Sequence, residues 1–177
     1  MKRLSWKYVA GLVDGEGCLD FQVMNHKAGK GNGLLQDRSY IRPRVRVCLS
    51  APGLDLLKNM HNNFGGHLNL RPRTFSNPMW ADAYSWELHG KATIGFLQNI
   101  KNHLILKQNQ AEFLLAYSLT CSAKHHGEPD FVRKFQTLVR DELKAMRKDP
   151  HRLSDPARIL EQVREATVET ILEPATA

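Results

Sequence analysis

The chain has 177 residues and a mass of 20.2 kDa, which suits one domain and is long enough to bury a normal core. A net charge of +7, with 42% hydrophobic and 24% charged residues, is typical of a folded globular protein and excludes disorder along the whole length. No apolar run approaches the roughly 18 residues needed to cross a bilayer, and three scattered cysteines exclude a disulfide framework. We therefore expect a soluble, intracellular protein, whose compartment the composition does not specify.

The predicted elements follow the order α-β-β-α-β-β-α and then continue as helices. Helices are predicted where apolar residues recur at three- and four-residue spacing, and strands where apolar and polar residues alternate. The Gly-rich segment 25–37 lacks a phosphate-loop pattern and predicts a hairpin connection. In chain order we expect a helix at Trp6–Asp14, strands at Cys18–Met24 and Tyr40–Leu49, a helix at Leu54–Asn63, strands at His67–Arg73 and Ala83–Leu88, and helices at Lys91–Asn102, Gln108–Thr120, Pro129–Met146 and Pro156–Leu172.

These elements predict an α+β fold built on a four-stranded antiparallel sheet. Each predicted strand has one apolar face, which would meet the helices, and one polar face, which would be open to a ligand. Pro43 and Pro72 predict edges, bends or positions without a ladder hydrogen bond, since proline has no N–H. We expect residues 1–122 to form the core of the domain and residues 123–177 to form a C-terminal helical extension of it.

The positive charge is concentrated in the first part of the chain. Residues 1–107 contain 15 Lys and Arg against 7 Asp and Glu, whereas residues 108–177 contain 10 against 11. Arg42, Arg44 and Arg46 alternate with apolar residues, so they share one face of a strand. Three arginines in one row are costly to hold together without an anionic partner, and Arg, Asn and Gln pair with base edges in the major groove. Nucleic acid is therefore the expected ligand, with a solvated basic surface as the alternative.

The residues predicted to face this ligand come from all four strands. They are the outward positions of the alternating pattern: Gln22, Met24, Arg42, Arg44, Arg46, His67, Asn69, Arg71, Arg73, Ser85 and Glu87.

Residues 9–17, with the sequence VAGLVDGEG, form the most specific motif of the chain. Ala10 and Gly11 are small enough for two such helices to approach closely, and Val9, Leu12 and Val13 would anchor the contact. The acid that follows lies at a helix C-terminus, where the macrodipole disfavours a carboxylate by about 0.3–1 kcal/mol. A pair of acids held at such a place would attract a divalent cation.

This motif resembles the LAGLIDADG motif of the homing endonucleases at all nine positions, and the order of the predicted elements resembles the core of that family over roughly residues 5–120. The resemblance implies a site-specific, divalent-metal-dependent endonuclease, a phosphodiester hydrolase that cuts both strands of a long pseudo-palindromic DNA target. The origin from an intron, an intein or a free-standing gene stays open, although a chain of 177 residues without splicing blocks favours an intron-encoded or free-standing reading frame. The C-terminal helices lie outside the part of the chain that carries the motif.

The resemblance assigns roles to the residues of the motif. Glu16, at the eighth position, would bind the catalytic Mg²⁺, a site that Mn²⁺ or Ca²⁺ can also occupy, and the backbone carbonyl of Gly15 would be a further ligand. Asp14 is expected to be structural. Because the chain has one motif, the second acid would come from a second copy of the chain, as in the homodimeric members. The dimer interface would consist of Val9, Ala10, Gly11, Leu12 and Val13.

The segment LILKQNQ at 104–110 resembles the Leu-Lys-Gln-x-Gln pattern of the homodimeric relatives, so Lys107 is the candidate catalytic lysine beside the scissile phosphate. The chain departs from the family where relatives carry a Gln and an Arg after the second strand. Here that segment, residues 49–53, offers only Ser50, so the water-positioning network differs, or Arg46 or another side chain takes the place of the missing Gln and Arg.

Two other functions are weighed against cleavage. The first is an intron RNA maturase or a non-cleaving DNA-binding regulator on the same fold, which could lose the acid at position 16. The second is an unrelated RNA-binding α+β domain, which would expose aromatic residues on its sheet for base stacking. Tyr84 and Trp86 instead share the apolar face with Leu88, so the sequence favours the endonuclease.

Overall fold

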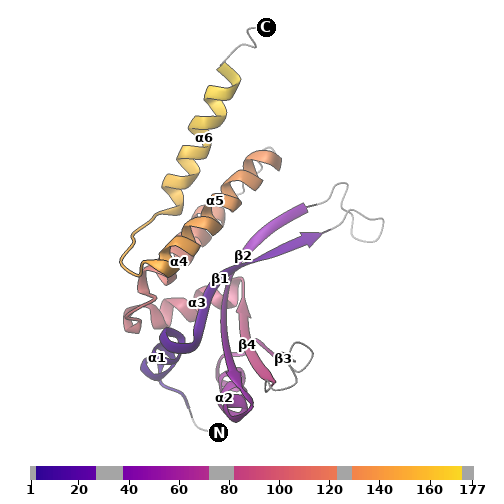
Figure 1. Cartoon of the computed structure of the whole chain (residues 1–177), viewed down its shortest axis with the longest axis vertical. Coiled ribbons are helices and arrows are strands. Elements are labelled where there is room, and N and C mark those ends of the chain that lie inside the picture. Colours follow the sequence, from indigo (N-terminus) through magenta and orange to yellow (C-terminus); the bar gives the residue numbers. More distant parts are fainter. Residues whose placement is uncertain (1–2, 27–37, 72–81, 123–128, 173–177) are drawn as a thin grey trace.

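A four-stranded antiparallel sheet with helices packed over one face is the centre of the computed structural model (Figure 1). The structure describes residues 3–26, 38–71, 82–122 and 129–172. None of the helices in this part of the chain is long and apolar enough to cross a membrane. In chain order the elements are α1 (Trp6–Glu16), β1 (Gly17–His26), β2 (Arg38–Ser50), the 3-10 turn η1 (Ala51–Gly53), α2 (Leu54–Phe64), β3 (His67–Arg71), β4 (Ala83–His89), α3 (Lys91–Ile100), the 3-10 turn η2 (Lys101–His103), α4 (Gln108–Ser122), α5 (Pro129–Lys148) and α6 (Pro156–Leu172).

The strands are ordered β1-β2-β4-β3, and every neighbouring pair is antiparallel. β2 has 13 residues and is longer than its neighbours β1 and β4, which have 10 and 7. Alternate residues of β2, such as Val45 and Val47, are fully buried, whereas the three arginines between and beside them are only half-buried. The predicted fold class and the two-faced sheet are therefore confirmed.

Pro43 lies within the central strand β2, yet it breaks no ladder with β4. The pairing of β2 with β4 begins at Arg44, which is opposite His89, so Pro43 lies just past the end of β4. There the N–H of Gly90 donates to the carbonyl of Pro43 at 2.9 Å, and no N–H is needed in return. The other predicted break, Pro72, lies outside the described residues. Of the predicted connection over residues 25–37, Asn25 and His26 belong to β1, and residues 27–37 lie outside the described residues.

One hydrophobic cluster joins the sheet to the helices, including the last two. Tyr117 of α4 lies between Phe21 of β1 and Phe135 of α5, with ring centroids 4.6 and 6.1 Å away. Arg147 of α5 donates from Nη2 to the carbonyl of Leu19 at 2.7 Å, although 128 residues separate them. Figure 1 shows α5 and α6 side by side, and α5 reaching back towards β1 and β2. The segment predicted as a helical extension thus shares the core of the preceding residues. It contributes Phe135, Val139, Leu143, Met146, Ile159, Leu160 and Val163.

The aromatic residues of β4 face the helices, as predicted. Trp86 is fully buried, donates from its indole N–H to the carbonyl of Gly65 at 2.8 Å, and packs against Phe64 and Phe96. Tyr84 is half-buried against the same core. The exposed stacking platform expected of the unrelated RNA-binding domain is therefore not formed by this strand.

The junction between α1 and β1 is tight because the helix passes directly into the strand. Ser5 caps the start of α1 by accepting a hydrogen bond from the N–H of Tyr8 at 3.3 Å. At the other end, a Cβ on Gly17 would lie 2.5 Å from the carbonyl oxygen of Val13. Gly17 has a φ of −82°, so the glycine is needed for close approach and not for left-handed backbone. At Gly15 an added Cβ would meet nothing within 4 Å, so this glycine is not needed for close approach within the chain.

Candidate functional site

Glu16 is the last residue of α1, and its side chain is exposed. Gly15, whose carbonyl is the second predicted metal ligand, is also exposed on this last turn. A carboxylate and a backbone carbonyl are the oxygen ligands that Mg²⁺ accepts, so this donor set fits the ion. Among the described residues, however, no group of three or more His, Cys, Asp or Glu side chains could hold a metal.

Lys107 lies at the same end of α1. Its ammonium donates to the carbonyl of Val13 at 2.9 Å and also to the carbonyl of Asp14. Partial burial lowers the pKa of Lys107 below its ordinary value, while the nearby charges of Asp14, Cys18 and Glu16 act in the opposite direction. The structure thus brings the predicted lysine to the helix end that carries Glu16.

Asp14 fastens the segment that carries this lysine to the motif helix. Its Oδ2 accepts from the backbone N–H of Ile105 at 2.6 Å, and its Oδ1 accepts from the backbone N–H of Lys107 at 3.0 Å. Hydrogen bonds to a charged acceptor are each worth about 1.5–3 kcal/mol. The geometry fits the structural role expected for Asp14, and the acid fixes the loop before α4 relative to α1.

The predicted dimer interface needs a correction. Val9, Ala10 and Val13 are fully buried in the core of their own chain, against the sheet and the other helices. Helical spacing then places a second face of α1 outward, because residues three and four apart share a face. Tyr8 is 51% exposed there, Gly11 and Gly15 are exposed with open space around them, and Leu12 is half-buried. This outward face consists of Tyr8, Gly11, Leu12 and Gly15.

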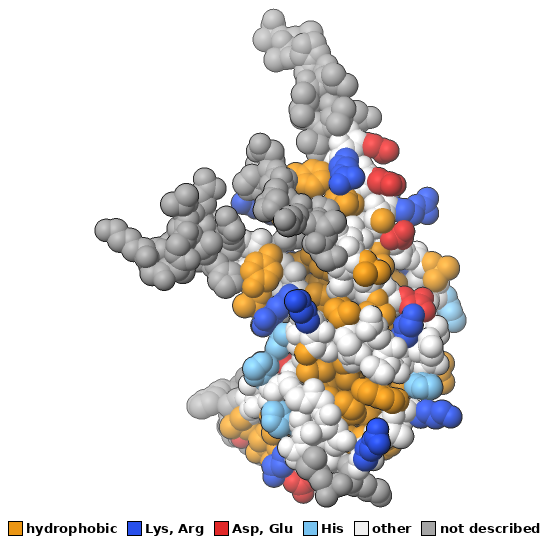
Figure 2. Space-filling view, turned by 180° about the vertical axis from the view of Figure 1, so that it is seen from behind, with side chains coloured by type: hydrophobic (Ala, Val, Ile, Leu, Met, Phe, Trp, Pro, Cys, Tyr) orange, Lys and Arg blue, Asp and Glu red, His pale blue; other side chains and the backbone are white. Residues whose placement is uncertain are grey.

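The exposed hydrophobic surface continues beyond α1. Ile105 and Leu106, which lie next to the loop that Asp14 holds, are 86% and 55% exposed. Figure 2 shows that hydrophobic side chains are exposed on one face of the molecule, among Lys, Arg and His side chains.

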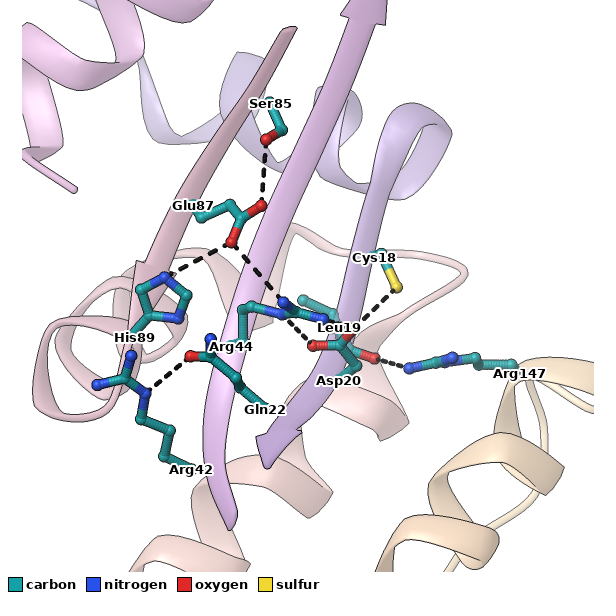
Figure 3. Close-up of polar contacts among 10 residues, drawn as sticks. All are labelled: Cys18, Leu19, Asp20, Gln22, Arg42, Arg44, Ser85, Glu87, His89 and Arg147. Atoms are coloured by element: carbon teal, nitrogen blue, oxygen red, sulfur yellow. Dashed lines mark hydrogen bonds and ion pairs between the residues drawn. The ribbon is translucent and has the colours of Figure 1, made fainter. Parts of the chain in front are cut away.

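The polar face of the sheet contains an arginine that is already paired within the chain (Figure 3). Arg44 of β2 is opposite Asp20 of β1 and donates from Nε and Nη2 to its two carboxylate oxygens, both at 2.7 Å. The third nitrogen, Nη1, lies 3.7 Å from Oε2 of Glu87. These contacts raise the pKa of Arg44, chiefly through the hydrogen bond to Asp20. The anionic partner that the arginine row requires is thus supplied in part by the protein, which sequence reasoning missed.

The other arginines of the row are differently placed. Arg42 donates from Nε to Oε1 of Gln22 at 2.9 Å, across the β1–β2 pair. Arg46 is opposite Cys18, two residues after Glu16, and its Nε is buried without a hydrogen-bond partner among the described residues. Arg46 is therefore the arginine of the row whose strand position is nearest the motif. Ser50, the polar residue of the divergent segment, is exposed at the end of β2.

The predicted ligand-facing residues of β3 and β4 fall into two groups. Ser85 and Glu87 are on the expected face but buried, at 0% and 4% exposure, and Ser85 donates to Glu87 at 3.1 Å. They are covered by neighbouring side chains and offer little surface. His67 and Asn69 on β3 are exposed, and Met24 on β1 is half-buried. The side chain of Arg71 and the whole of Arg73 lie outside the described residues.

His89 also belongs to this face, although the sequence reasoning did not include it. Its Nε2 lies 3.6 Å from Oε2 of Glu87, and its ring centroid lies 5.5 Å from that of His67. Burial lowers the pKa of His89, and Arg42 contributes in the same direction. The signal was available, because the alternation of Ser85 and Glu87 continues to position 89, one residue past the predicted strand end.

Comparison with known proteins places this geometry in a known fold. No protein-family model matches the sequence, and no curated protein matches it. Among solved structures, the homing endonuclease I-CvuI, in complex with its target in the presence of Ca, is similar at a TM-score of 0.58 and 18% identity, over 92% of this chain and 94% of that chain. The archaeal intron-encoded homing endonuclease I-Vdi141I, complexed with DNA, is similar at 0.57 and 14% identity, over 92% and 96%.

A longer structure is matched differently. I-SmaMI, a meganuclease bound to an uncleaved DNA target in the presence of calcium ions, is similar at a TM-score of 0.51 and 17% identity. The match covers 94% of this chain but only 50% of that chain. The LAGLIDADG homing endonuclease I-GzeII, in complex with its DNA target, is matched over 51% of its length, at a TM-score of 0.50. The chain therefore has the LAGLIDADG homing endonuclease fold, as the motif indicated.

Proposed function

We propose that this chain is a site-specific, divalent-metal-dependent DNA endonuclease that cuts a pseudo-palindromic target as a homodimer. The observation that carries the proposal is the end of α1. An exposed acid, Glu16, is placed there beside a lysine whose ammonium binds the same helix end. This end belongs to a fold that is shared with I-CvuI and I-Vdi141I, two homing endonucleases that were solved in complex with DNA and are matched over nearly their whole length.

The metal site is proposed to form where two chains meet. Glu16 and the carbonyl of Gly15 would hold Mg²⁺ in each half, and the second acid would come from Glu16 of a second copy. A bound divalent cation supplies positive charge to the phosphate oxygens and lowers the pKa of a coordinated water. Because Glu16 is at the helix end and its side chain is exposed, it reaches such a site without a change in the core.

Lys107 places a positive charge at the same position. Two backbone carbonyls of α1 orient its ammonium, so little conformational freedom is lost when a phosphate approaches. A fixed cation at the place where negative charge develops lowers a barrier without reorganisation at the moment of reaction. Its lowered pKa also makes Lys107 a readier proton donor than an exposed lysine.

Two observations support a homodimer. The outward face of α1 includes two glycines with open space around them, which permits the close approach of an identical helix. The chain matches nearly all of I-CvuI and I-Vdi141I but only about half of I-SmaMI and I-GzeII, so two copies of it would equal the longer chains in length. An isologous dimer predicts a two-fold related target.

The sheet is proposed to bind DNA through its polar face. The excess positive charge of the chain lies in residues 1–107, which include all four strands. Antiparallel ribbons can enter the major groove, and Arg, Gln and Asn side chains there distinguish base pairs. On this face Gln22 and Arg42 are half-buried and Asn69 is exposed, so each has side-chain surface that is open to a ligand.

The test is a cleavage selection on a randomised or genomic DNA library with Mg²⁺, comparing wild type with Glu16→Gln. We expect a defined, nearly palindromic cut site for wild type and no cutting by the variant, with binding retained. A matched control is Glu112→Gln, an exposed acid on α4, which should cut like wild type. Binding without cutting by wild type would favour a maturase or a DNA-binding regulator on the same fold, and cutting by Glu16→Gln at the wild-type rate would contradict the assigned role.

A further inference from the structure

We infer that the arginine row on β2 has two different roles. Arg42, oriented by Gln22, reads a guanine, whereas Arg44 is a structural residue that is held by Asp20 and Glu87 and reads no base. The inference rests on the proposed function, because it assumes that the polar face of the sheet meets DNA.

The hydrogen-bonding capacity of Arg44 is directed at carboxylates of its own chain. Its Nε and Nη2 are each 2.7 Å from an oxygen of Asp20, in the two-pronged geometry that a guanidinium would otherwise use on guanine. Its remaining nitrogen faces Glu87 at 3.7 Å. Figure 3 shows the guanidinium enclosed between the two acids, one from β1 and one from β4.

Burial makes this arrangement difficult to open. The side chain of Arg44 is 16% exposed, that of Asp20 13%, and that of Glu87 5%. Turning Arg44 towards a base would remove both of its 2.7 Å hydrogen bonds to Asp20, and breaking a buried ion pair is strongly destabilising because it leaves a buried charge without that partner. The three side chains also carry two negative charges and one positive charge, so this cluster does not attract a phosphate.

Arg42 is placed in the opposite way. A single contact, from Nε to Oε1 of Gln22 at 2.9 Å, fixes the plane of its guanidinium. Within the part of the chain that the structure describes, no hydrogen bond or ion pair takes up its Nη1 and Nη2. The orientation is set before binding, which lowers the entropy lost on contact.

The chemistry of this pair selects guanine. The oxygen of Gln22 is engaged by Arg42, so the groups left on the pair are chiefly N–H donors: the two terminal nitrogens of Arg42 and the amide nitrogen of Gln22. In the major groove guanine presents two acceptors, N7 and O6, whereas adenine presents one acceptor and one donor. A surface that consists of donors therefore favours guanine over adenine.

The register also places the guanine within the target. Moving away from the end of α1, the paired positions are Cys18 with Arg46, then Asp20 with Arg44, then Gln22 with Arg42. The guanine that Arg42 reads is thus further from the centre of the DNA target than the base pair that faces Arg44.

The test compares the base preferences of wild type, Arg42→Ala, Arg44→Ala and Asp20→Asn by selection of bound sites from a randomised DNA library. Arg42→Ala should lose a guanine preference at one position by roughly 5- to 150-fold. Arg44→Ala should keep the wild-type preferences at every position. Asp20→Asn, which releases Nε and Nη2 of Arg44 from the carboxylate, should add a guanine preference at a position nearer the centre of the DNA target. A position relaxed by Arg44→Ala, or an unaltered profile for either of the other variants, would overturn the inference.

A second measurement does not require DNA. In a double-mutant cycle, Asp20→Asn and Arg44→Met should shift the thermal midpoint together by less than the sum of their separate shifts, because the two residues form one contact. Additive shifts would refute the pairing. If the wild-type chain binds no DNA, the proposed function fails while this cycle still reports on the pair. If Arg44→Ala does not fold, Arg44→Lys, which keeps the charge but lacks the fork, replaces it with the same expected profile.

Discussion

Asp14 and Lys107 are joined in both directions. The backbone N–H of Lys107 donates to Oδ1 of Asp14 at 3.0 Å, and the ammonium of Lys107 donates to the backbone carbonyl of Asp14. The two residues are 93 positions apart in the chain, so these contacts fix the start of α4 to the end of the motif helix. Asp14 and Lys107 belong to two separate sequence motifs, and in the structure they form one unit.

Replacing this acid should cost stability. In Asp14→Asn the side chain keeps its size but offers one oxygen and no charge to the two N–H donors at Ile105 and Lys107, so we expect a loss of about 1.5–3 kcal/mol in the free energy of unfolding. Urea denaturation would measure it. Asp55→Asn is a suitable control, because Asp55 is exposed and surface substitutions usually change stability by less than about 0.5 kcal/mol. Equal midpoints for the two variants would show that the carboxylate does not hold the loop.

Two glycines of the motif should respond oppositely to alanine. Gly17→Ala places a Cβ 2.5 Å from the backbone oxygen of Val13, where no flexible side chain can give way, and should cost about 1–3 kcal/mol. Within its own chain, Gly15→Ala meets open space in a helix, so in a Gly11→Leu background, which removes the proposed partner helix, it should be neutral or stabilise the chain by up to about 1 kcal/mol. Thermal unfolding of both variants measures these changes in stability. A larger loss of stability for Gly15→Ala than for Gly17→Ala would contradict the tight junction between α1 and β1.

The outward face of α1 should determine the oligomeric state. In Gly11→Leu, a bulky side chain on that face separates the proposed partner helices, and we expect a monomer with an intact fold. Light scattering after gel filtration gives the mass, and circular dichroism checks the helix content. Gly95→Leu is a matched control, since Gly95 is an exposed glycine of α3 with nothing within 4 Å of an added Cβ. A Gly11→Leu protein that stays dimeric would place the interface elsewhere.

His89 should make the stability of the chain depend on pH. Burial lowers its pKa below the ordinary 6.5, with Arg42, His67 and Arg44 acting in the same direction and Glu87 against them. Above pH 6.5 His89 is neutral in both the folded and the unfolded chain. As the pH falls, the unfolded chain takes up this proton more readily than the folded one, so stability is lost down through the folded-state pKa.

This titration can be isolated by substitution. Between about pH 7 and 5, where histidines titrate, the midpoint temperature of thermal unfolding should fall more steeply with decreasing pH for wild type than for His89→Gln. His151→Gln, which removes an exposed histidine, should follow the wild-type slope. If His89→Gln and wild type lose stability in parallel, the lowered pKa of His89 is not coupled to folding.

Local pattern was sufficient for the elements themselves. The alternation in Arg42, Arg44 and Arg46 fixed a strand with one polar face, and α2 and α6 begin at the residues expected from the sequence. The predicted C-terminal end of α1 was wrong by two residues, because the helix continues to Glu16. The residue at which a helix ends depends on the segment that follows it, which here is the tight passage into β1. The spacing of apolar residues within the helix does not determine it.

Pattern was not sufficient for the interface of α1. The helix has two apolar faces, one with Val9 and Val13 and one with Tyr8 and Leu12, and helical spacing shows which residues share a face without showing what each face meets. The first face proved to be the internal one. Only packing against the sheet could decide this.

The sequence by itself determined the order of helices and strands, the polar and apolar faces of the sheet, and the acid at the end of a motif helix, because each is set by neighbours within a few residues. The tertiary structure decided that Arg44 is paired with Asp20 and Glu87, and that Lys107 lies beside the end of α1. These relationships depend on strand register and on contacts between distant segments, and neither is encoded in local periodicity.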